Sequence, residues 1–508
     1  MHCSSLLIPI ALLALQSLAL ELSIPPANSS EPLKVQEFKF KKIKKNVQNL
    51  PRNHTELLEK RSPRTVLQRL DNSDFLYYAE VSIGTPAQNL RLHLDTGSSD
   101  IWVESPRSEL CKQPDNPCEI TGMFDEHKSS TYKKVSNNFQ ISYVDGEYAQ
   151  GDYGKDVFRV GRDVAVQNVQ FAIGLESTST EGIMGIGFET NQVAVQRLGK
   201  SPYPGLTRLM VEQGLIKSRA YSLWLNDLDA DEGEVLFGGV DTAKFQGNLT
   251  TLPIDKRIGA TEAREFMITL TSVGLTNDQG KSINLTKESF AVPVLLDTGT
   301  TYTYLPSDLY NEIALQVGAN INDGTGVPTA PCDIRNYNGS VDFSFSGAII
   351  RVPVNELVVD AYAFDGSPAT YFDGTPLCYF GIMDAGEDNN VLGDTFLRSA
   401  YIVFDLDNQE ISIAPAIYNA TDSNIIEIGT GKNAVPDAEG ATSAVIVPPT
   451  GVSGGRGDGD PIYTGNPDST ASASRLSGPS ATAGSGATTV YISWFLVAAC
   501  AAMTQFSF

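Results

Sequence analysis

Two copies of the tripeptide Asp-Thr-Gly constrain the fold of this chain more than any other feature. They are Asp95-Thr96-Gly97 and Asp297-Thr298-Gly299, about two hundred residues apart, each after a mostly apolar run and before hydroxyl residues. A β-type run can deliver such an aspartate to a tight turn, where glycine allows close backbone approach. Two carboxylates in matching settings suggest a paired acid and base, and the spacing predicts an internally duplicated chain.

The composition fits a large acidic protein with two lobes and tails. The chain has 508 residues, of which 41% are hydrophobic, which suffices for a large core and exceeds one ordinary domain. Its net charge is −23, but residues 21–61 carry nine Lys/Arg against five Asp/Glu, so a balance of −27 falls on residues 62–508. This acidity argues against nucleic-acid binding and is compatible with cationic substrates, with low pH, or with solubility alone.

The N-terminus is typical of a secreted precursor. Residues 1–19 have no charged side chain, contain an apolar run from Leu6 to Leu15 and end in Ser17-Leu18-Ala19, so they predict a signal peptide too short to span a bilayer. The lysine-rich residues 20–61 end in the dibasic pair Lys60-Arg61, which predicts a removable propeptide. A nuclear-localisation or membrane-surface role for these lysines competes with that interpretation, and the signal peptide disfavours it.

Cysteines and glycosylation motifs fit the same oxidising compartment. Cys3 and Cys500 lie in the terminal segments, and four cysteines remain. Of their three possible connectivities, Cys111–Cys118 with Cys332–Cys378 is favoured because each bridge stays within one lobe. Zinc binding is disfavoured because no Cys-x-x-Cys or clustered histidine is present. The Asn-x-Ser/Thr motifs, predicted to lie at the surface, begin at Asn28, Asn53, Asn248, Asn284, Asn338 and Asn419.

The body is predicted to be mostly β, with lobes at residues 62–250 and 251–417. Short helices are expected at Gly205 to Gln213 and Ser307 to Val317. The expected strands are Leu76 to Ile83, Leu90 to Leu94, Ile141 to Val144, Ala220 to Leu225, Val235 to Gly238, Phe266 to Leu270, Phe343 to Phe345, Ile349 to Val354, Ala400 to Asp405 and Glu410 to Ala414.

The amino-acid composition of the chain changes after Ile417. Residues 418–485 are rich in Gly, Ser, Thr, Ala and Pro and predict a flexible stalk. Small residues within 477–486, followed by an uncharged apolar tail in 486–508, predict a glycosylphosphatidylinositol (GPI) attachment signal whose tail is removed. A permanent membrane span is the rival, but no Lys or Arg follows the tail. The expected location is therefore the cell surface, at the plasma membrane or cell wall.

Further motifs resemble the pepsin family of aspartic proteases, and within it the fungal, surface-anchored yapsin type. The resemblance covers roughly Tyr77 to Ala414. It rests on both Asp-Thr-Gly copies and on the segments Ala79-Glu80-Val81-Ser82-Ile83-Gly84-Thr85-Pro86, Ile101-Trp102-Val103, Glu181-Gly182-Ile183-Met184-Gly185-Ile186-Gly187 and Val391-Leu392-Gly393-Asp394-Thr395-Phe396-Leu397. The fold that this resemblance implies is a mostly β, bilobal pepsin-like fold with lobes related by a pseudo-twofold axis and a central active-site cleft.

The resemblance also implies a β-hairpin flap over that cleft. Tyr143 is then the flap tyrosine that closes on substrate, and Trp102 is its hydrogen-bond partner. The sequence departs from the common pattern at Val144, where glycine is frequent, and at Asp145, where threonine is frequent. An acidic residue at this position is associated in the family with accepting Lys or Arg beside the scissile bond; the alternative is a surface hairpin with Asp145 as a turn residue.

By the same resemblance, the chain is expected to be an aspartic endopeptidase. Asp95 and Asp297 hold one water and share one proton, since two adjacent carboxyls do not both ionise cheaply. The expected positioning residues are Thr96, Ser98, Thr298 and Trp102. The expected substrate-binding residues are Tyr143, Asp145, Gly146, Gly299, Thr300 and Thr301. No cofactor or metal is needed, the substrates are peptides or proteins, and a monomer is expected.

Other functions remain as alternatives. The chain could be a general acid protease with hydrophobic specificity, or a wall-anchored binding protein that has kept a protease fold. Serine- or cysteine-protease chemistry is disfavoured because it needs a histidine as general base. The only histidines are His2, His54, His93 and His127, and the first two fall in segments expected to be removed. A glycosidase would hold its two carboxylates farther apart.

Overall fold

The structure of the protein is a computed structural model that describes residues 64–73, 76–143, 147–161, 164–256, 260–321, 327–363, 367–386 and 390–446. The predicted signal peptide, propeptide and GPI signal lie outside these ranges, as do Lys60, Arg61, Asp145, Gly146, Asn28 and Asn53. Among the described residues, no helix has both the length and the apolar character that crossing a bilayer requires.

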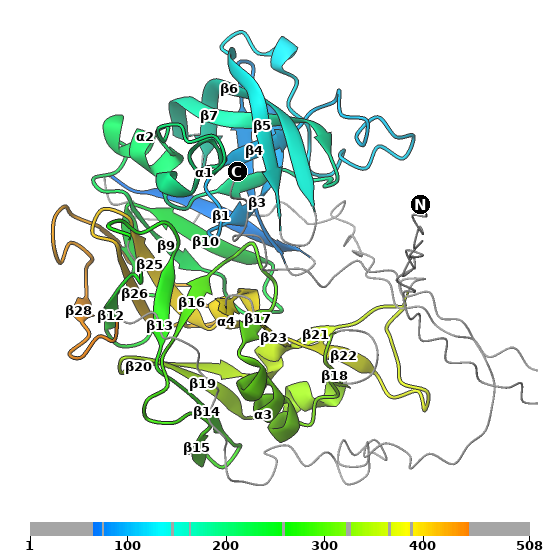
Figure 1. The fold of residues 1–508 in the computed structure, drawn as a ribbon, viewed down its shortest axis with the longest axis vertical. Coiled ribbons are helices and arrows are strands. Elements are labelled where there is room, and N and C mark those ends of the chain that lie inside the picture. The colour runs from blue at the N-terminus through cyan, green and yellow to red at the C-terminus, as the bar shows by residue number, and fades with distance from the viewer. Residues whose placement is uncertain are drawn as a thin grey trace, which may run out of the picture. The chain divides into compact units, whose positions relative to one another are not determined.

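One sheet of fourteen strands organises the described part of the chain (Figure 1). Its strand order is β28-β12-β26-β25-β9-β10-β1-β2-β3-β8-β4-β7-β6-β5, so strands from the early and late thirds of the sequence share it. The bounds are β1 Val66–Ser73, β2 Leu76–Ile83, β3 Gln88–Asp95, β4 Ile101–Glu104, β5 Lys133–Ser142, β6 Tyr148–Val160, β7 Val164–Ser177, β8 Ile183–Gly185, β9 Ala220–Trp224, β10 Glu232–Phe237, β12 Leu249–Pro253, β25 Ala400–Asp405, β26 Glu410–Pro415 and β28 Ala438–Gly440.

Smaller sheets and a few short helices complete the described residues. The remaining strands are β11 Gly239–Asp241, β13 Met267–Leu270, β14 Ser272–Thr276, β15 Ser282–Asn284, β16 Val292–Leu296, β17 Thr303–Leu305, β18 Thr329–Pro331, β19 Ser340–Phe345, β20 Ala348–Pro353, β21 Val358–Asp360, β22 Leu377–Phe380, β23 Ile382–Asp384, β24 Asn390–Leu392 and β27 Ile425–Glu427. The α-helices are α1 Val193–Gln196, α2 Leu206–Glu212, α3 Ser307–Val317 and α4 Asp394–Leu397, and 3-10 helices span Glu126–Lys128, Glu189–Asn191, Cys332–Asn336 and Val354–Leu357. The mostly β prediction is confirmed.

Burial explains why the strands differ in sequence. Every residue of β25 is buried, because this strand lies between β9 and β26 inside the large sheet and packs on both faces. Strand β20 instead alternates buried and exposed residues, as expected for a strand with one face towards water. Aromatic side chains fill the core beside β25, where Phe404 stacks on Tyr221 with ring centroids 4.9 Å apart.

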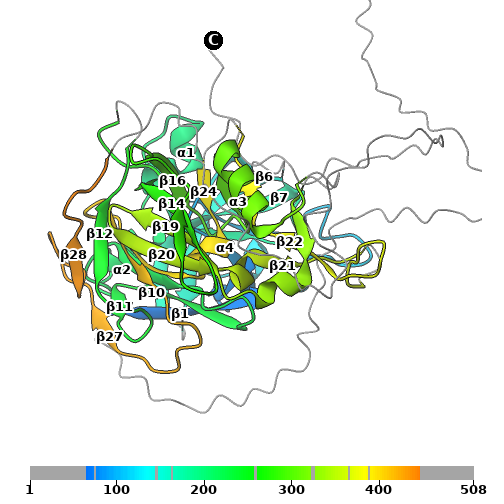
Figure 2. The same ribbon diagram turned by 90° about the horizontal axis from the view of Figure 1, so that it is seen from below.

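Residues 418–446, which the sequence assigns to the flexible stalk, instead belong to the folded body. Strand β27 pairs with β11, and β28 pairs in parallel with β12 at the edge of the large sheet (Figure 2). The side chains of Ile428 and Val435 are buried in the same cluster as Trp224 and Val240. A few apolar residues spaced along a polar segment are enough to hold it, because the body supplies the opposing surface and the hydrogen-bond partners.

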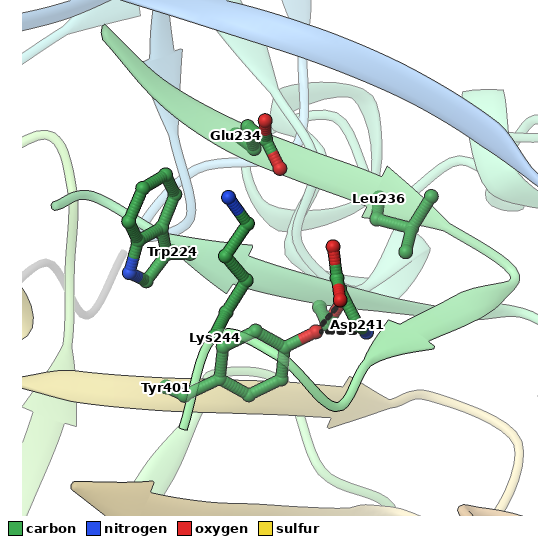
Figure 3. Close-up of a pocket in the computed structure, with 7 residues that line it drawn as sticks. Trp224, Glu234, Leu236, Asp241, Lys244 and Tyr401 are labelled. Atoms are coloured by element: carbon green, nitrogen blue, oxygen red, sulfur yellow. Dashed lines mark hydrogen bonds between the residues drawn. The ribbon is translucent and has the colours of Figure 1, made fainter. Parts of the chain in front are cut away.

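Polar contacts fix this C-terminal extension, the name used below for residues 418–446. Asp241 accepts hydrogen bonds from the backbone of Asn424 and the hydroxyl of Ser423, both at 2.7 Å. The Lys244 ammonium donates to the carbonyl of Ala420 at 2.7 Å and lies 4.0 Å from the centroid of the Trp224 ring. Figure 3 shows Lys244 reaching towards Trp224 in the adjoining pocket, and the Tyr401 hydroxyl accepting from the backbone N–H of Asp241.

Both disulfides have the predicted pairing, Cys111 with Cys118 and Cys332 with Cys378. Glu104 lies beside the first bridge and completes a group of three potential metal-binding side chains. Because both cysteines are in the disulfide, only one carboxylate remains there to hold a metal. The four glycosylation motifs within the described ranges have exposed asparagines, as predicted: Asn248, Asn284, Asn338 and Asn419.

Candidate active site

Equivalent strands carry the two Asp-Thr-Gly segments. Strand β3 lies between the antiparallel β2 and the parallel β8, and β16 lies between the antiparallel β13 and the parallel β24. Strand β8 lies within the segment Glu181 to Gly187, and β24 leads into the segment Val391 to Leu397, so each aspartate strand has one of these family-like segments beside it. A Cβ at Gly185 would lie 2.6 Å from the Asp100 carbonyl oxygen, and one at Gly393 would lie 2.2 Å from that of Thr300. Only glycine fits at these two positions, because the backbone of another segment lies directly against each of them.

Reciprocal hydrogen bonds join the two turns through Thr96 and Thr298. The Thr96 hydroxyl accepts from the Thr298 backbone N–H at 3.0 Å and donates to the Leu296 carbonyl at 2.9 Å. In the same way, the Thr298 hydroxyl accepts from the Thr96 N–H at 3.1 Å and donates to the Leu94 carbonyl at 2.8 Å. Both threonines are buried, so each hydroxyl is used twice and the two loops are fixed against one another.

This arrangement brings the carboxylates of Asp95 and Asp297 together. The Gly97 N–H points at both, at 2.8 Å from Asp95 Oδ1 and 3.1 Å from Asp297 Oδ1. The Gly299 N–H donates to Asp297 Oδ1 at 2.8 Å. A Cβ at Gly97 would lie 2.5 Å from Asp297 Oδ1, and one at Gly299 would lie 2.7 Å from Asp95 Oδ1. Any other residue at either glycine would separate the two acids.

The hydroxyl residues after the glycines differ in how they contact the acids. The Thr300 hydroxyl donates to Asp297 Oδ2 at 2.8 Å. Ser98 contacts Asp95 Oδ1 through its backbone N–H at 3.1 Å. Thr301 is half-buried and Gly299 is exposed beside the acids.

Burial and mutual repulsion keep a proton on this pair of acids. Loss of hydration and, second, the neighbouring charge of Asp297 together raise the pKa of Asp95 from 3.8 to about 7, although hydrogen bonds from Ser98 and Gly97 oppose the change. An acid beside a carboxylate can therefore persist at mildly acid pH. Such a pair can donate a proton and accept one at the same place.

The predicted flap tyrosine lies over the same region. The buried Trp102 donates from Nε1 to the Tyr143 hydroxyl oxygen at 2.7 Å. The Tyr143 backbone N–H donates to the Glu147 carbonyl at 2.7 Å, which closes the hairpin between β5 and β6. Burial, followed by the charge of Asp95, raises the pKa of Tyr143 well above its ordinary value, so its hydroxyl keeps its proton.

Asp100 is a further polar centre that the sequence does not single out. Its Oδ1 accepts from the hydroxyls of Tyr153 and Tyr203, both at 2.8 Å, and its Oδ2 accepts from the Val193 N–H at 2.7 Å. These partners come from β6, α1 and the loop after α1, so one buried carboxylate holds three segments beside Trp102. No local sequence motif predicts this role of Asp100, because all three donors are more than fifty residues from it in the sequence.

Comparisons with known proteins agree with this geometry. A family model described as eukaryotic aspartyl protease matches residues 76–416. A probable aspartic-type endopeptidase opsB of Aspergillus oryzae is 44% identical, over 82% of this chain and 84% of the relative. The aspartic proteinase yapsin-3 of Saccharomyces cerevisiae is 36% identical, over 74% of this chain and 72% of the relative. The secreted aspartic protease 6 of Candida albicans is 35% identical, over 73% of this chain and 82% of the relative. The chain therefore belongs to the eukaryotic aspartyl protease family and is an aspartic-type endopeptidase.

Proposed function

We propose that Asp95 and Asp297 form a catalytic dyad that hydrolyses peptide bonds of proteins at the cell surface, with a preference for sites that contain Lys or Arg. The observation that carries this proposal is the Gly97 N–H shared by both carboxylates, since one donor reaches both acids only if they are neighbours. Two such acids can hold one water between them and share one proton.

The reaction needs no covalent enzyme intermediate. The ionised carboxylate takes a proton from the water, whose oxygen attacks the scissile carbonyl carbon, while the protonated carboxyl donates to the carbonyl oxygen. The tetrahedral adduct then breaks its C–N bond: the protonated carboxyl gives its proton to the leaving nitrogen, and the ionised carboxylate takes a proton from one hydroxyl of the adduct. The products are a carboxylic acid and an amine, and the dyad again holds one proton. The half-buried Tyr143 is expected to close over the substrate and exclude water.

Activity should fall as the pH rises through about 7. The dyad needs one proton, and the pKa of Asp95 is about 7, so each further pH unit above that value should lower kcat/KM about tenfold. The measurement is a pH profile of kcat/KM on a peptide whose own charge does not change in this range. Recovery of full activity after return to acid pH controls for unfolding. A profile that stays level to about pH 8.5 would contradict a dyad that must keep its proton.

The preference for basic sites rests on Asp145, on the acidic body and on similarity to a relative named as a yapsin. Peptides with Lys-Arg should be cleaved about tenfold faster, in kcat/KM, than peptides with Leu-Phe at the same place, and Asp145→Thr should remove the difference. Asp278→Thr, the same change at an exposed turn far along the sequence, serves as the matched control. Equal cleavage of both peptides by the unmodified protein would favour a general acid protease with hydrophobic specificity.

Surface attachment completes the proposal. The small-residue segment and apolar tail predict a GPI anchor, and two similar proteins carry names that include yapsin and secreted aspartic protease. Release of the protein from intact cells by a phosphatidylinositol-specific phospholipase tests the anchor. A non-catalytic wall protein is the remaining alternative, and any cleavage that depends on Asp95 excludes it.

A further inference from the structure

His93 is a buried histidine next to the two acids that the proposed mechanism does not use. It lies two residues before Asp95 on β3, and its Nε2 is 3.1 Å from the backbone oxygen of Thr298 on the other Asp-Thr-Gly turn. A carbonyl oxygen can only accept a hydrogen bond, so Nε2 must carry the hydrogen. This contact is additional to the reciprocal threonine bonds.

The duplicated architecture makes the contact one-sided. In register, His93 faces Tyr78 and Ile183, and Leu295, two residues before Asp297, faces Met267 and Val391. Leucine has no hydrogen-bond donor in its side chain, so no matching side-chain bond runs from β16 to the first turn. The histidine therefore adds an element that the pseudo-symmetry does not require.

The peptide group that His93 contacts also contacts Asp297. The Thr298 carbonyl and the Gly299 N–H belong to one planar peptide unit, whose two ends point in opposite directions. His93 Nε2 lies 3.1 Å from the oxygen of this unit. At the other end of the same unit, the Gly299 N–H donates to Asp297 Oδ1 at 2.8 Å. Fixing the oxygen fixes the direction of the N–H, and a hydrogen bond at one end of a peptide unit strengthens the bond at the other.

We propose that His93 is a positioning residue for catalysis, which orients the Thr298–Gly299 peptide unit so that its N–H supports the carboxylate of Asp297. This inference deepens the proposed dyad and rests on it. The surrounding groups hold the imidazole in place: the Tyr78 ring lies 5.8 Å away, its hydroxyl donates to Glu181, and the Arg91 guanidinium lies 4.4 Å from the Tyr78 ring centroid. Nε2 keeps its hydrogen in both the neutral and the charged imidazole, so the link persists as the pH changes.

Steady-state kinetics of the mature protein test the role. His93→Leu should lower kcat about tenfold and leave KM within about twofold, because it disturbs the support of Asp297 and leaves Tyr143 and its partner Trp102 in place. His93→Gln, which keeps a donor on a side chain of similar length, should restore kcat to within about threefold of the unmodified protein. His127→Leu is the matched control, because His127 is 74% exposed on a short surface helix and should change neither constant.

Two results would overturn the proposal: an unchanged kcat in His93→Leu, or an equal loss of kcat in the leucine and glutamine variants. Asp95→Asn separates this failure from failure of the proposed function. If Asp95→Asn is inactive and His93→Leu keeps full kcat, only the role of His93 is wrong. If Asp95→Asn keeps full activity, the dyad itself is wrong.

Spectroscopy gives a second test that does not depend on activity and leaves His93 itself unchanged. His127→Leu with 15N-labelled histidine leaves His93 as the sole histidine downstream of Arg61. Its spectrum in the folded protein should report a hydrogen on Nε2 across about pH 5 to 8. A neutral imidazole with the hydrogen on Nδ1 alone would rule out the bond to Thr298.

Discussion

Replacing either Asp95 or Asp297 with asparagine should lower kcat/KM by about a thousandfold or more on a Lys-Arg peptide at mildly acid pH. Asparagine keeps the shape of aspartate but can neither ionise nor exchange the proton, so general acid and base catalysis are both lost. The double variant should be no worse than the single ones, because the two acids act as a unit. Asp278→Asn, at an exposed turn, should be fully active.

Although Asp95→Asn should abolish activity, it should not lower the thermal stability of the protein at pH 7. The pKa of Asp95 is raised to about 7 in the folded protein, so the folded state binds this proton more tightly than the unfolded state does. The free energy of unfolding of the unmodified protein should therefore decrease as the pH rises from about 4 to about 7, as this carboxyl is forced to ionise. Asp95→Asn cannot ionise and should melt at a temperature no lower than the unmodified protein at pH 7.

Thermal melting at several pH values, beside the kinetics, distinguishes a lost reaction from a lost fold. An inactive Asp95→Asn protein that melts well below the unmodified protein would assign Asp95 a structural role. Activity within about tenfold of the unmodified protein would remove the basis for the proposed dyad.

The sequence predicts the local parts of this site well. Strand β2 was predicted with its observed bounds, and Ala400–Asp405 likewise. Residue type and period specify these strands, since β-branched and aromatic residues lie between clear turn signals. The disulfide pairing also followed from chain position alone, because each bridge closes a loop within one half of the sequence.

Contacts between distant residues could not be predicted in this way. The bond from His93 to the Thr298 oxygen spans 205 residues, and the residue type of His93 does not reveal its partner. Asp100 is similar, because its acceptor role depends on two tyrosines that reach it from other elements. The C-terminal extension was missed for another reason: its composition resembles a linker, and only the surface of the body shows that it can be held.

The duplicated halves also differ in detail where their motifs agree. Thr300 contacts its aspartate through its hydroxyl, while the Ser98 bond to Asp95 runs through the backbone N–H. His93 has Leu295 as its counterpart. The first difference changes the kind of donor to each acid, and the second adds a side-chain contact to the second turn alone. The two acids therefore have unequal surroundings, as a pair that divides the roles of acid and base requires.

A chain that ends at Ile417 should unfold far more easily than one that ends at residue 446. The loss would expose Trp224 and Val240 and would remove the buried Ile428, each worth about 1.5 to 3 kcal/mol of burial. It would also leave the buried Asp241 and Lys244 without several of their partners, which costs about 1 to 3 kcal/mol for each group. Together these terms are a large part of the stability of an ordinary domain.

Denaturant unfolding of the two chains, read by tryptophan fluorescence, measures the difference. A matched pair within the extension isolates burial from chain length: Ile428→Ala removes a fully buried side chain and should cost about 2 to 5 kcal/mol, while Ile426→Ala, at a position 37% exposed, should cost less than about 1 kcal/mol. If the chain ending at Ile417 unfolds at the same denaturant concentration, the extension is a passive linker. If it unfolds earlier, residues 418–446 are an integral part of the folded enzyme.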